Sequence, residues 1–215
     1  MTKQQTISSN NNSYLITPSL LNAWAFIEQS VEYVRESEND TISYEDKCEE
    51  MRVKAFNDFL KVLNREQVEQ NEAMKLGVEF EDETYKGNTC FSDIVKGGAW
   101  QIVGKKYETI GGLDFLLYGR LDVLKAGKIY DIKRVSSWKL GKYAKSYQHA
   151  FYLHLFSDCN EFEYLIFDGK KGHIEHYYRD ECEDIRNVIS DFVGWLENNN
   201  LLDLYKEKWR TKYGR

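Results

Sequence analysis

Residues 116–135 read LLYGRLDVLKAGKIYDIKRV and decide the expected fold. Two strand-like runs, Leu116 to Leu124 and Ile129 to Val135, lie on either side of the small-residue pair Ala126-Gly127. A pair of this kind between two such runs predicts a hairpin with a two-residue loop. A three-residue loop would shift the register by one residue, and the pairing across the hairpin would be lost.

The two-residue loop places Lys125 opposite Lys128 and Asp122 opposite Asp131. Opposed residues hold their Cβ atoms roughly 5 Å apart, where like charges destabilise the pair. A divalent cation would offset the repulsion, and Mg²⁺ prefers carboxylate oxygens and water as ligands. Strand alternation puts Lys133 beside Asp131, where an ammonium would orient or help deprotonate an attacking water and stabilise charge on a phosphate. The hairpin therefore predicts metal-dependent phosphodiester cleavage.

Four spaced motifs surround this hairpin: Gly77-Val78-Glu79-Phe80-Glu81, Gly119-Arg120-Leu121-Asp122, Asp131-Ile132-Lys133 and Gln148-His149-Ala150-Phe151-Tyr152. Their order resembles the RecB-type branch of the PD-(D/E)XK nucleases, which includes recombination exonucleases and CRISPR adaptation nucleases. The segment 16–24 (ITPSLLNAW) is similar to the opening segment of that family. The resemblance covers about residues 16–152. It implies an α/β fold with a restriction-endonuclease-like core, in which helices flank a central mixed β-sheet.

Carried over residue by residue, the resemblance implies that Glu81, Asp122, Asp131 and the backbone carbonyl of Ile132 bind Mg²⁺ or Mn²⁺. Lys133 becomes the catalytic lysine. Glu81 lies in an acidic run from residue 79 to residue 83, so Glu79 or Glu83 would be the ligand if the helix were rotated.

Gln148 and Tyr152 complete the implied catalytic set. They are four residues apart, so a helix from about Tyr143 to Ser157 would present both on one face, toward the site or the strand being cut. The alternative is an amphipathic helix with a buried tyrosine.

The formal net charge of -6 is unevenly placed. Residues 32–85 hold 16 acidic and 7 basic side chains, whereas residues 99–147 hold 10 basic and 4 acidic ones. Basic and aromatic side chains interleave in the second segment, a mixture suited to gripping a single nucleic-acid strand. The alternative is an ordinary lysine-rich surface over core aromatics. The predicted nucleic-acid-binding residues are Arg120, Arg134, Trp138, Lys139, Lys145 and Tyr147.

Cys48, Cys90, Cys159 and Cys182 are widely spaced and form no Cys-x-x-Cys pair, so we expect reduced thiols and no iron-sulfur cluster. The chain has no apolar run long enough for a membrane span, and its polar start has no signal-peptide core. We expect a cytoplasmic protein without a membrane partner.

The chain is expected to form a single domain over residues 14–215, after a flexible polar tail over residues 1–13, with another flexible loop at 36–40. Periodicity predicts helices near 17–36, 44–72, around Glu81, 143–157, 183–198 and 201–213. It predicts strands near 99–108, 114–124, 128–135, 162–167 and 173–179.

The function implied by the resemblance is a DNA exonuclease acting on single-stranded or duplex ends, in recombination, repair or phage replication. Such an enzyme could work with a recombination or replication partner protein. The fold class also includes endonucleases and RNA-cleaving enzymes. A different class of function is a nucleic-acid-binding or protein-binding module that keeps the fold without using catalysis.

Overall fold

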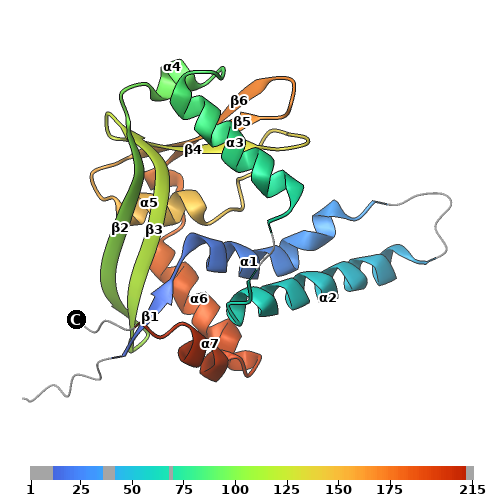
Figure 1. Cartoon of the computed structure of the whole chain (residues 1–215). Helices are drawn as coiled ribbons and strands as arrows, with labels where there is room; N and C mark the ends of the chain where they lie inside the picture. The colour runs from blue at the N-terminus through green and yellow to red at the C-terminus, as the bar shows by residue number, and fades with distance from the viewer. Residues whose placement is uncertain (1–11, 36–41, 68–69, 212–215) are drawn as a thin grey trace, which may run out of the picture.

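The structure is a computed structural model that describes residues 12–35, 42–67 and 70–211. The predicted tail up to residue 11 and the predicted loop at 36–40 lie outside these residues. Figure 1 shows the arrangement of the elements. In chain order they are β1 (Ser13–Ile16), α1 (Pro18–Gln29), η1 (Ser30–Tyr33), α2 (Tyr44–Leu63), α3 (Glu72–Lys86), α4 (Ser92–Val95), β2 (Ala99–Ile110), β3 (Leu113–Lys125), β4 (Lys128–Arg134), α5 (Gln148–Leu155), β5 (Glu161–Phe167), β6 (Gly172–Tyr178), η2 (Arg179–Glu181), α6 (Ile185–Asn198) and α7 (Leu202–Lys208).

The strands of the described chain form one mixed sheet in the order β1-β3-β4-β5-β6, with β2 on the other edge of β3. The long strand β3 pairs in parallel with β1 near its start and antiparallel with β4 near its end. Strands β4 and β5 are parallel, whereas β2 with β3 and β5 with β6 are antiparallel. Helices flank this sheet, so the predicted α/β fold class with a central mixed sheet is confirmed.

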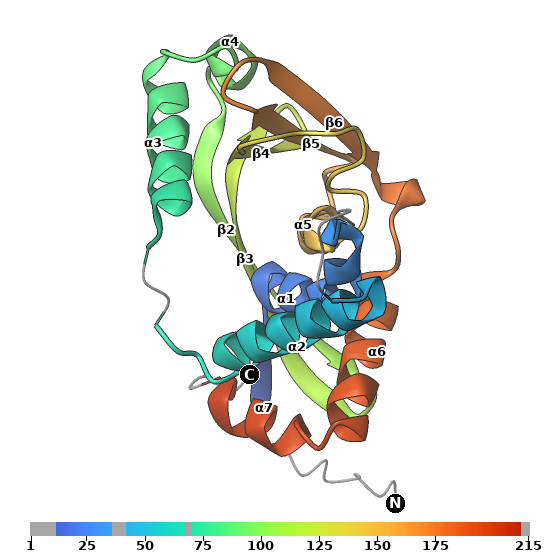
Figure 2. The same ribbon diagram turned by 90° about the vertical axis from the view of Figure 1, so that its right-hand side faces the viewer.

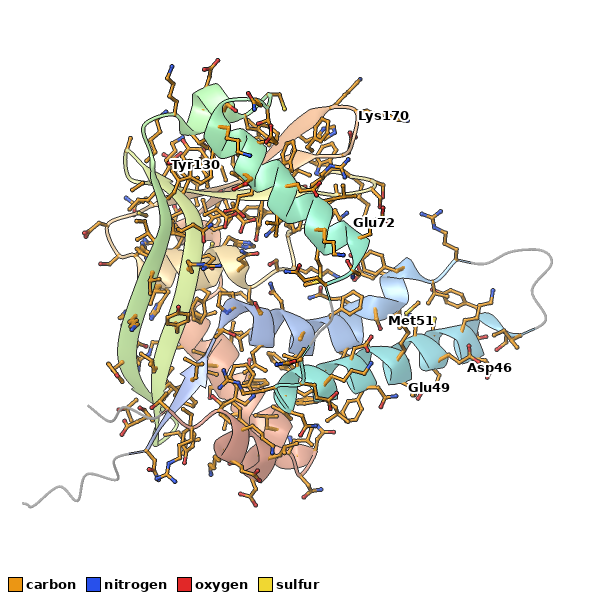
Figure 3. The ribbon with its side chains drawn as sticks, in the orientation of Figure 1. Asp46, Glu49, Met51, Glu72, Tyr130 and Lys170 are labelled. Carbon is orange, nitrogen blue, oxygen red and sulfur yellow. The ribbon has the colours of Figure 1, made fainter. Side chains whose placement is uncertain are left out.

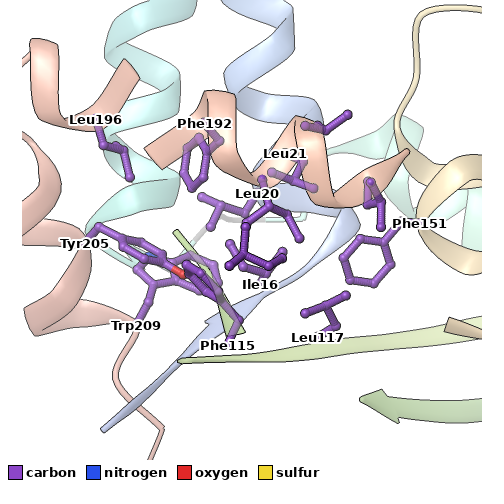
Figure 4. Packing of buried hydrophobic residues seen from close by; sticks show 14 of the residues in the cluster. Ile16, Leu20, Leu21, Phe115, Leu117, Phe151, Phe192, Leu196, Tyr205 and Trp209 are labelled. Atoms are coloured by element: carbon purple, nitrogen blue, oxygen red, sulfur yellow. The ribbon is translucent and has the colours of Figure 1, made fainter. Parts of the chain in front are cut away.

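Helices lie on both sides of the long strands. In Figure 2, β2 and β3 run between α3 on one side and α5 on the other. The largest apolar cluster joins α1, α6 and α7 to β1 and the start of β3; Figure 4 shows Ile16, Leu20, Phe115, Phe192 and Tyr205 packed within it. Two smaller clusters lie under α5 and under the pair α3 and α4. None of the described helices combines the length and the apolar character needed to cross a membrane.

The first strand of the sheet, β1, lies before every strand that the sequence analysis predicted. Ser13, the last residue of the predicted tail, is buried and begins β1, a strand that the sequence analysis did not predict. The strand ends at Ile16, and Thr17 then caps α1 by accepting a hydrogen bond from the Leu20 amide, with Pro18 in the first turn. A proline at this position fits because its missing N–H would have no helical partner. The segment 16–24 is therefore a strand-to-helix junction.

Four predicted helices have different boundaries. The helix predicted over 17–36 ends as α1 at Gln29 and continues as the short 3-10 helix η1. The helix predicted over 44–72 ends at Leu63, and Arg65, two residues later, takes a left-handed φ of 57°. The helix around Gln148 begins at Gln148 instead of Tyr143, after a series of separate turns over residues 139–146. The helix predicted over 201–213 ends at Lys208.

Helix α5 packs directly against β3 through Gly119 and Tyr152. A Cβ atom built on Gly119 would lie 2.5 Å from Cε1 of the Tyr152 ring, which is too close for any other residue type without movement. The Tyr152 hydroxyl donates to the backbone carbonyl of Arg120 at 2.7 Å. The glycine of one motif thus makes room for the tyrosine of another.

We predict that Gly119→Ala lowers the free energy of unfolding by about 1–3 kcal/mol, because the added methyl group overpacks the Tyr152 ring. Urea unfolding of both proteins measures the difference. Gly194→Ala is the matched control: that glycine is inside α6 with no atom within 4 Å of the added Cβ, so stability should stay equal or rise by up to about 1 kcal/mol. Equal effects of the two substitutions would contradict this packing.

Candidate active site

The hairpin between β3 and β4 has the predicted two-residue loop. Ala126 and Gly127 both have left-handed φ angles, 51° and 77°, which is the signature of a type I′ turn. Lys125 pairs with Lys128, as predicted. The ladder then ends at the pair Val123 and Tyr130. In this register the next opposed residues are Asp122 and Asp131, and there the two strands separate.

The pairing of β3 with β2 is interrupted at the same place. The ladder contains Trp100 with Val123 and Ile102 with Leu121, but no pair joins the intervening Gln101 to Asp122 in the described chain. Gln101 has a left-handed φ of 54°. A non-glycine residue in this region is strained and often marks a functional site.

At the interruption, the side chains of β2 and β3 also change from one face of the sheet to the other. Leu121 packs in the cluster under α5, whereas Val123, two residues later, packs in the cluster under α3 and α4. Residues two apart in a regular strand lie on the same face. We call the row Gln101, Asp122 and Asp131 the open row, because the sheet is unpaired there on both sides of β3.

Asp122 uses its side chain to bridge this gap. Its Oδ2 accepts a hydrogen bond from the backbone N–H of Ile132 at 2.9 Å, so the carboxylate lies between β3 and β4. Burial raises the pKa of Asp122 to about 8, with a further contribution from the negative charge of Asp131. The two aspartates are therefore close enough for the ionisation of one to disfavour that of the other.

Asp131 is almost fully buried and faces α5. Its Oδ2 lies 2.6 Å from Nζ of Lys133, and Gln148 donates its side-chain amide to Oδ1. Burial raises the pKa of Asp131 despite these partners. Burial by itself would lower the pKa of Lys133, but the charges of Asp131 and Asp122 more than offset it and raise that pKa. Lys133 is therefore an ammonium at neutral pH.

Gln148 and Tyr152 lie one turn apart on α5 but have different roles. Gln148 begins the helix and reaches Asp131, as the first interpretation predicted. Tyr152 is buried against Gly119, which matches the alternative of a buried core tyrosine. Its contact with the Arg120 carbonyl fixes α5 on β3 close to Asp122.

Helix α3 brings Glu81 to the site. Glu81 is half-buried and its carboxylate accepts from the side-chain amide of Gln101. Burial raises the pKa of Glu81, and the negative charge of Asp131 contributes. Glu79 is exposed, and Glu83 bonds instead to Lys86 at 2.9 Å and to Asn88 at 2.7 Å. Of the three glutamates in the acidic run, Glu81 is the one that the structure brings to Asp131.

Gln101 is a site residue that the sequence analysis missed. It lies in the open row opposite Asp122 and holds the Glu81 carboxylate through its side-chain amide. A glutamine between Trp100 and Ile102 fits an ordinary alternating strand, so the sequence carries no signal for its left-handed φ. The contact depends on the packing of α3 beside the strand.

The donor set fits a hard divalent cation. Glu81, Asp122 and Asp131 supply carboxylate oxygens, the ligand type that Mg²⁺ and Mn²⁺ prefer. Oδ2 of Asp131 is buried without a hydrogen bond of good geometry, although Lys133 lies close to it. In the described residues, however, no three acidic, histidine or cysteine side chains already converge on one point. Hydrogen-bond donors of the protein contact the three carboxylates instead. A cation would have to displace some of these hydrogen bonds.

The six predicted nucleic-acid-binding residues occupy different environments. Trp138 is half-buried, with its Nε1 donating to Glu175 at 2.6 Å, and Tyr147 stacks on Trp24 with ring centroids 6.0 Å apart. Lys145 forms an ion pair with Glu32. The remaining three are Arg120 and Lys139, which are exposed, and Arg134, which is half-buried at the end of β4.

No family model matches the chain, and no curated protein matches its sequence. Several solved structures resemble it at low similarity, including two over most of this chain. The crystal structure of SSO0001 has a TM-score of 0.47 and 17% identity over 93% of this chain and 79% of that chain. A protein named "Putative exonuclease" from Eubacterium rectale has a TM-score of 0.42 and 13% identity over 100% of this chain and 90% of that chain. Similarity this low supports no argument about function.

His149 lies beside Gln148 on α5 and is buried. Its ring stacks on Tyr177 with centroids 4.0 Å apart. Burial lowers the pKa of His149 to about 4. We assign it no role in the chemistry, but the lowered pKa makes the stability of the fold dependent on pH.

We predict that His149 contributes a loss of stability as the pH falls from about 6.5 to about 4, which the raised pKa of Asp122 opposes in the wild type. In this window the unfolded state binds a proton at His149 and the folded state does not, so this histidine favours unfolding on acidification by an amount on the order of 3 kcal/mol. Urea unfolding at pH 7 and pH 4.5 measures the change in the free energy of unfolding between the two pH values, which should favour the folded state more in His149→Gln than in the wild type by about this amount. His176→Gln, at an exposed histidine, should show the same change as the wild type. An identical pH dependence in wild type and His149→Gln would contradict the prediction.

Proposed function

We propose that this chain is a metal-dependent nuclease of the PD-(D/E)XK superfamily, RecB-type branch, that hydrolyses phosphodiester bonds of DNA with Mg²⁺ or Mn²⁺. The observation that carries the proposal is the group of Asp122, Asp131 and Lys133 at the open row, in which Asp131 is buried and the other two residues are half-buried. A strand interruption that holds two mutually repelling carboxylates partly out of water beside an ammonium has a cost in stability. Such a cost is expected where the arrangement serves a reaction.

Glu81, Asp122 and Asp131 would hold the cation, together with the backbone carbonyl of Ile132. When bound, the cation supplies Lewis acidity toward a phosphoryl oxygen and lowers the pKa of a water. Lys133 is charged, so it stabilises negative charge on the phosphate and orients the attacking water rather than accepting its proton. Gln148 holds Asp131 and Gln101 holds Glu81, so the two amides fix the carboxylates in place.

The resemblance extends the proposal to exonuclease action on DNA ends, in recombination, repair or phage replication with a partner protein. One observation favours the alternative of a binding module without catalysis: each of the three carboxylates already has a donor within the protein. Digestion of labelled linear and circular DNA, and of RNA, separates exonuclease from endonuclease and from RNA-cleaving activity.

We predict that Lys133→Ala and Asp131→Asn each lower the rate of DNA hydrolysis by about 100-fold or more, because each removes charge from the reacting centre. The assay uses end-labelled linear single-stranded and duplex DNA with Mg²⁺, Mn²⁺ or EDTA. Glu81→Gln should lower the rate by at least about 10-fold. Glu79→Gln, two residues away on the exposed side of α3, is its matched control and should keep the rate within about twofold.

Equal degradation by wild type and by both variants at Asp131 and Lys133 would show that the assigned residues are not catalytic. If no protein degrades DNA and all of them bind it, the binding-module alternative is correct.

We predict that saturating Mn²⁺ stabilises the protein in the absence of DNA, because the cation relieves the repulsion between Asp122 and Asp131. At a concentration about 100 times its Kd, the gain is about 2.7 kcal/mol, which corresponds to a rise in Tm of about 5–10 °C. Thermal unfolding with Mn²⁺ or EDTA measures it. Asp122→Asn should lose most of the rise, whereas Asp93→Asn, in α4 and outside the site, should retain it. A rise of the same size in all three proteins would place the ion elsewhere.

A further inference from the structure

A groove lies beside the candidate active site, between η1 and residues 137–142. Its volume is about 310 Å³. Glu32, Tyr33 and Arg35 line one wall, and Trp138, Lys139 and Lys142 line the other. Glu32 forms an ion pair with Lys145. Cations and aromatic rings therefore alternate across it. The Tyr33 side chain is 53% exposed and packs against the exposed ring of Phe26, with centroids 5.7 Å apart.

The groove continues onto α2. A second hollow of about 320 Å³ shares Tyr33 and Arg35 with the first and extends to Lys47, Met51 and Lys54. Glu50 is the acidic residue in its lining. We call the two hollows together the arm groove, because α1, η1 and α2 form an arm that projects from the sheet (Figure 1). The arm groove is basic although the whole chain has a net charge of -6.

A further hollow on α2 adjoins the arm groove and shares Glu50 and Lys54 with it. Its charged lining is more acidic than basic: Asp46, Glu49, Glu50 and Asp58 against Lys54 and Lys61. Figure 3 shows Asp46 and Glu49 on the side of α2 away from α1, and Met51 on the side that faces it. A polyanion is attracted more to the arm groove, where basic residues outnumber acidic ones, than to this more acidic hollow.

One wall of the arm groove is held in place by contacts within the protein. Glu175 is buried and accepts hydrogen bonds from the Trp138 side chain at 2.6 Å and from the backbone N–H groups of Lys142 and Tyr143 at 3.2 and 3.3 Å. The Trp138 ring also stacks on His173, with centroids 3.9 Å apart. Fixed aromatic side chains lose little conformational entropy on binding. The groove can therefore offer Trp138 as a rigid surface.

The two walls are also tied to each other and to the active site. Gln29 at the end of α1 donates its side-chain amide to the Lys145 carbonyl at 3.0 Å. Tyr143, next to Lys142 of the groove, is half-buried and stacks on Tyr164 with ring centroids 4.4 Å apart. Burial raises the pKa of Tyr143 to about 12, and the charges of Lys133 and Asp131 also act on it.

We propose that the arm groove binds an unpaired nucleic-acid strand and leads it to or from the carboxylate site. Alternating cations and aromatic rings bind a single strand through its phosphates and the faces of its bases. Base pairs in a duplex are stacked on their neighbours, so a duplex cannot offer its base faces to Tyr33 and Trp138. The part of the proposal that concerns a strand being cut rests on the proposed nuclease function, whereas the binding itself does not.

Binding is tested with a fluorescein-labelled 20-mer of thymidine and with a 20-base-pair duplex, by anisotropy in EDTA at several salt concentrations. All proteins are full chains that carry Asp131→Asn, so that no cleavage occurs. Adding Arg35→Ala and Lys139→Ala should weaken binding of the single strand at least about 10-fold and reduce the salt slope by about one to two, because phosphate contacts are lost. Duplex affinity should change by less than about twofold.

Lys61→Ala with Lys86→Ala is the matched control, since both lysines are exposed but lie outside the arm groove. This pair should leave the single-strand Kd within about twofold. Equal weakening by both pairs, or no weakening by Arg35→Ala with Lys139→Ala, would overturn the proposal. Circular dichroism melting checks that all variants fold.

Stacking is tested separately with Tyr33→Ala. This change should weaken binding of the thymidine strand by about 5-fold to 100-fold, the range for loss of one stacked base, yet leave an abasic strand of equal length unaffected. Equal losses on both strands would overturn the role of stacking.

The two proposals fail in different ways. If the protein binds the single strand through the arm groove but cleaves no DNA, the groove stands and the nuclease function falls. If the chain without Asp131→Asn cleaves DNA, and Arg35→Ala with Lys139→Ala changes neither KM nor kcat, the nuclease function stands and the groove falls.

Discussion

The open row at Gln101, Asp122 and Asp131 is the constraint around which the rest of the structure is arranged. Strand β3 pairs with β2 along almost its whole length, and on its other edge with β1 over residues 114–117 and with β4 over residues 123–125. At Asp122 both edges are open, because Gln101 has a left-handed φ and β4 has separated from β3. The Asp122 carboxylate accepts the backbone N–H of Ile132 in place of a strand partner. The open row thus creates a polar site inside the sheet.

This arrangement buries charge, and burial of charge requires compensation. Lys133 and Gln148 provide it for Asp131, and the Gln101 amide provides it for Glu81. The compensation is incomplete, because burial still raises the pKa of Asp122 and that of Asp131. The site is therefore held in a state that a positive charge would stabilise further. Gly119 and Tyr152 keep α5 close enough to β3 for Gln148 to reach its partner.

Charge is organised on a larger scale as well. The arm carries acidic side chains on one side of α2 and basic and aromatic ones along the groove that faces residues 137–142. Glu175 orders those residues by accepting several hydrogen bonds, so one buried carboxylate fixes the wall opposite Tyr33 and Arg35. A chain with a negative net charge can therefore still present a basic path next to its buried carboxylates.

The sequence by itself determined the features that depend on neighbours along the chain. Ala126-Gly127 fixed the hairpin loop, because Gly127 adopts a left-handed φ without strain, and the loop fixed the register that opposes Asp122 to Asp131. Alternation then placed Lys133 beside Asp131, and helical spacing placed Gln148 one turn from Tyr152. These relations hold at short range, where backbone geometry leaves few choices.

Tertiary structure alone decided the relations between segments far apart in the chain. It selected Glu81 over Glu79 and Glu83, because the packing of α3 on the sheet sets which face of the helix turns inward. It placed Gln101 in the site, added β1 to the sheet, and began α5 only at Gln148, after the turns of residues 139–146. A sequence pattern reports the period of an element, but the rotation and contacts of that element depend on partners that packing brings together.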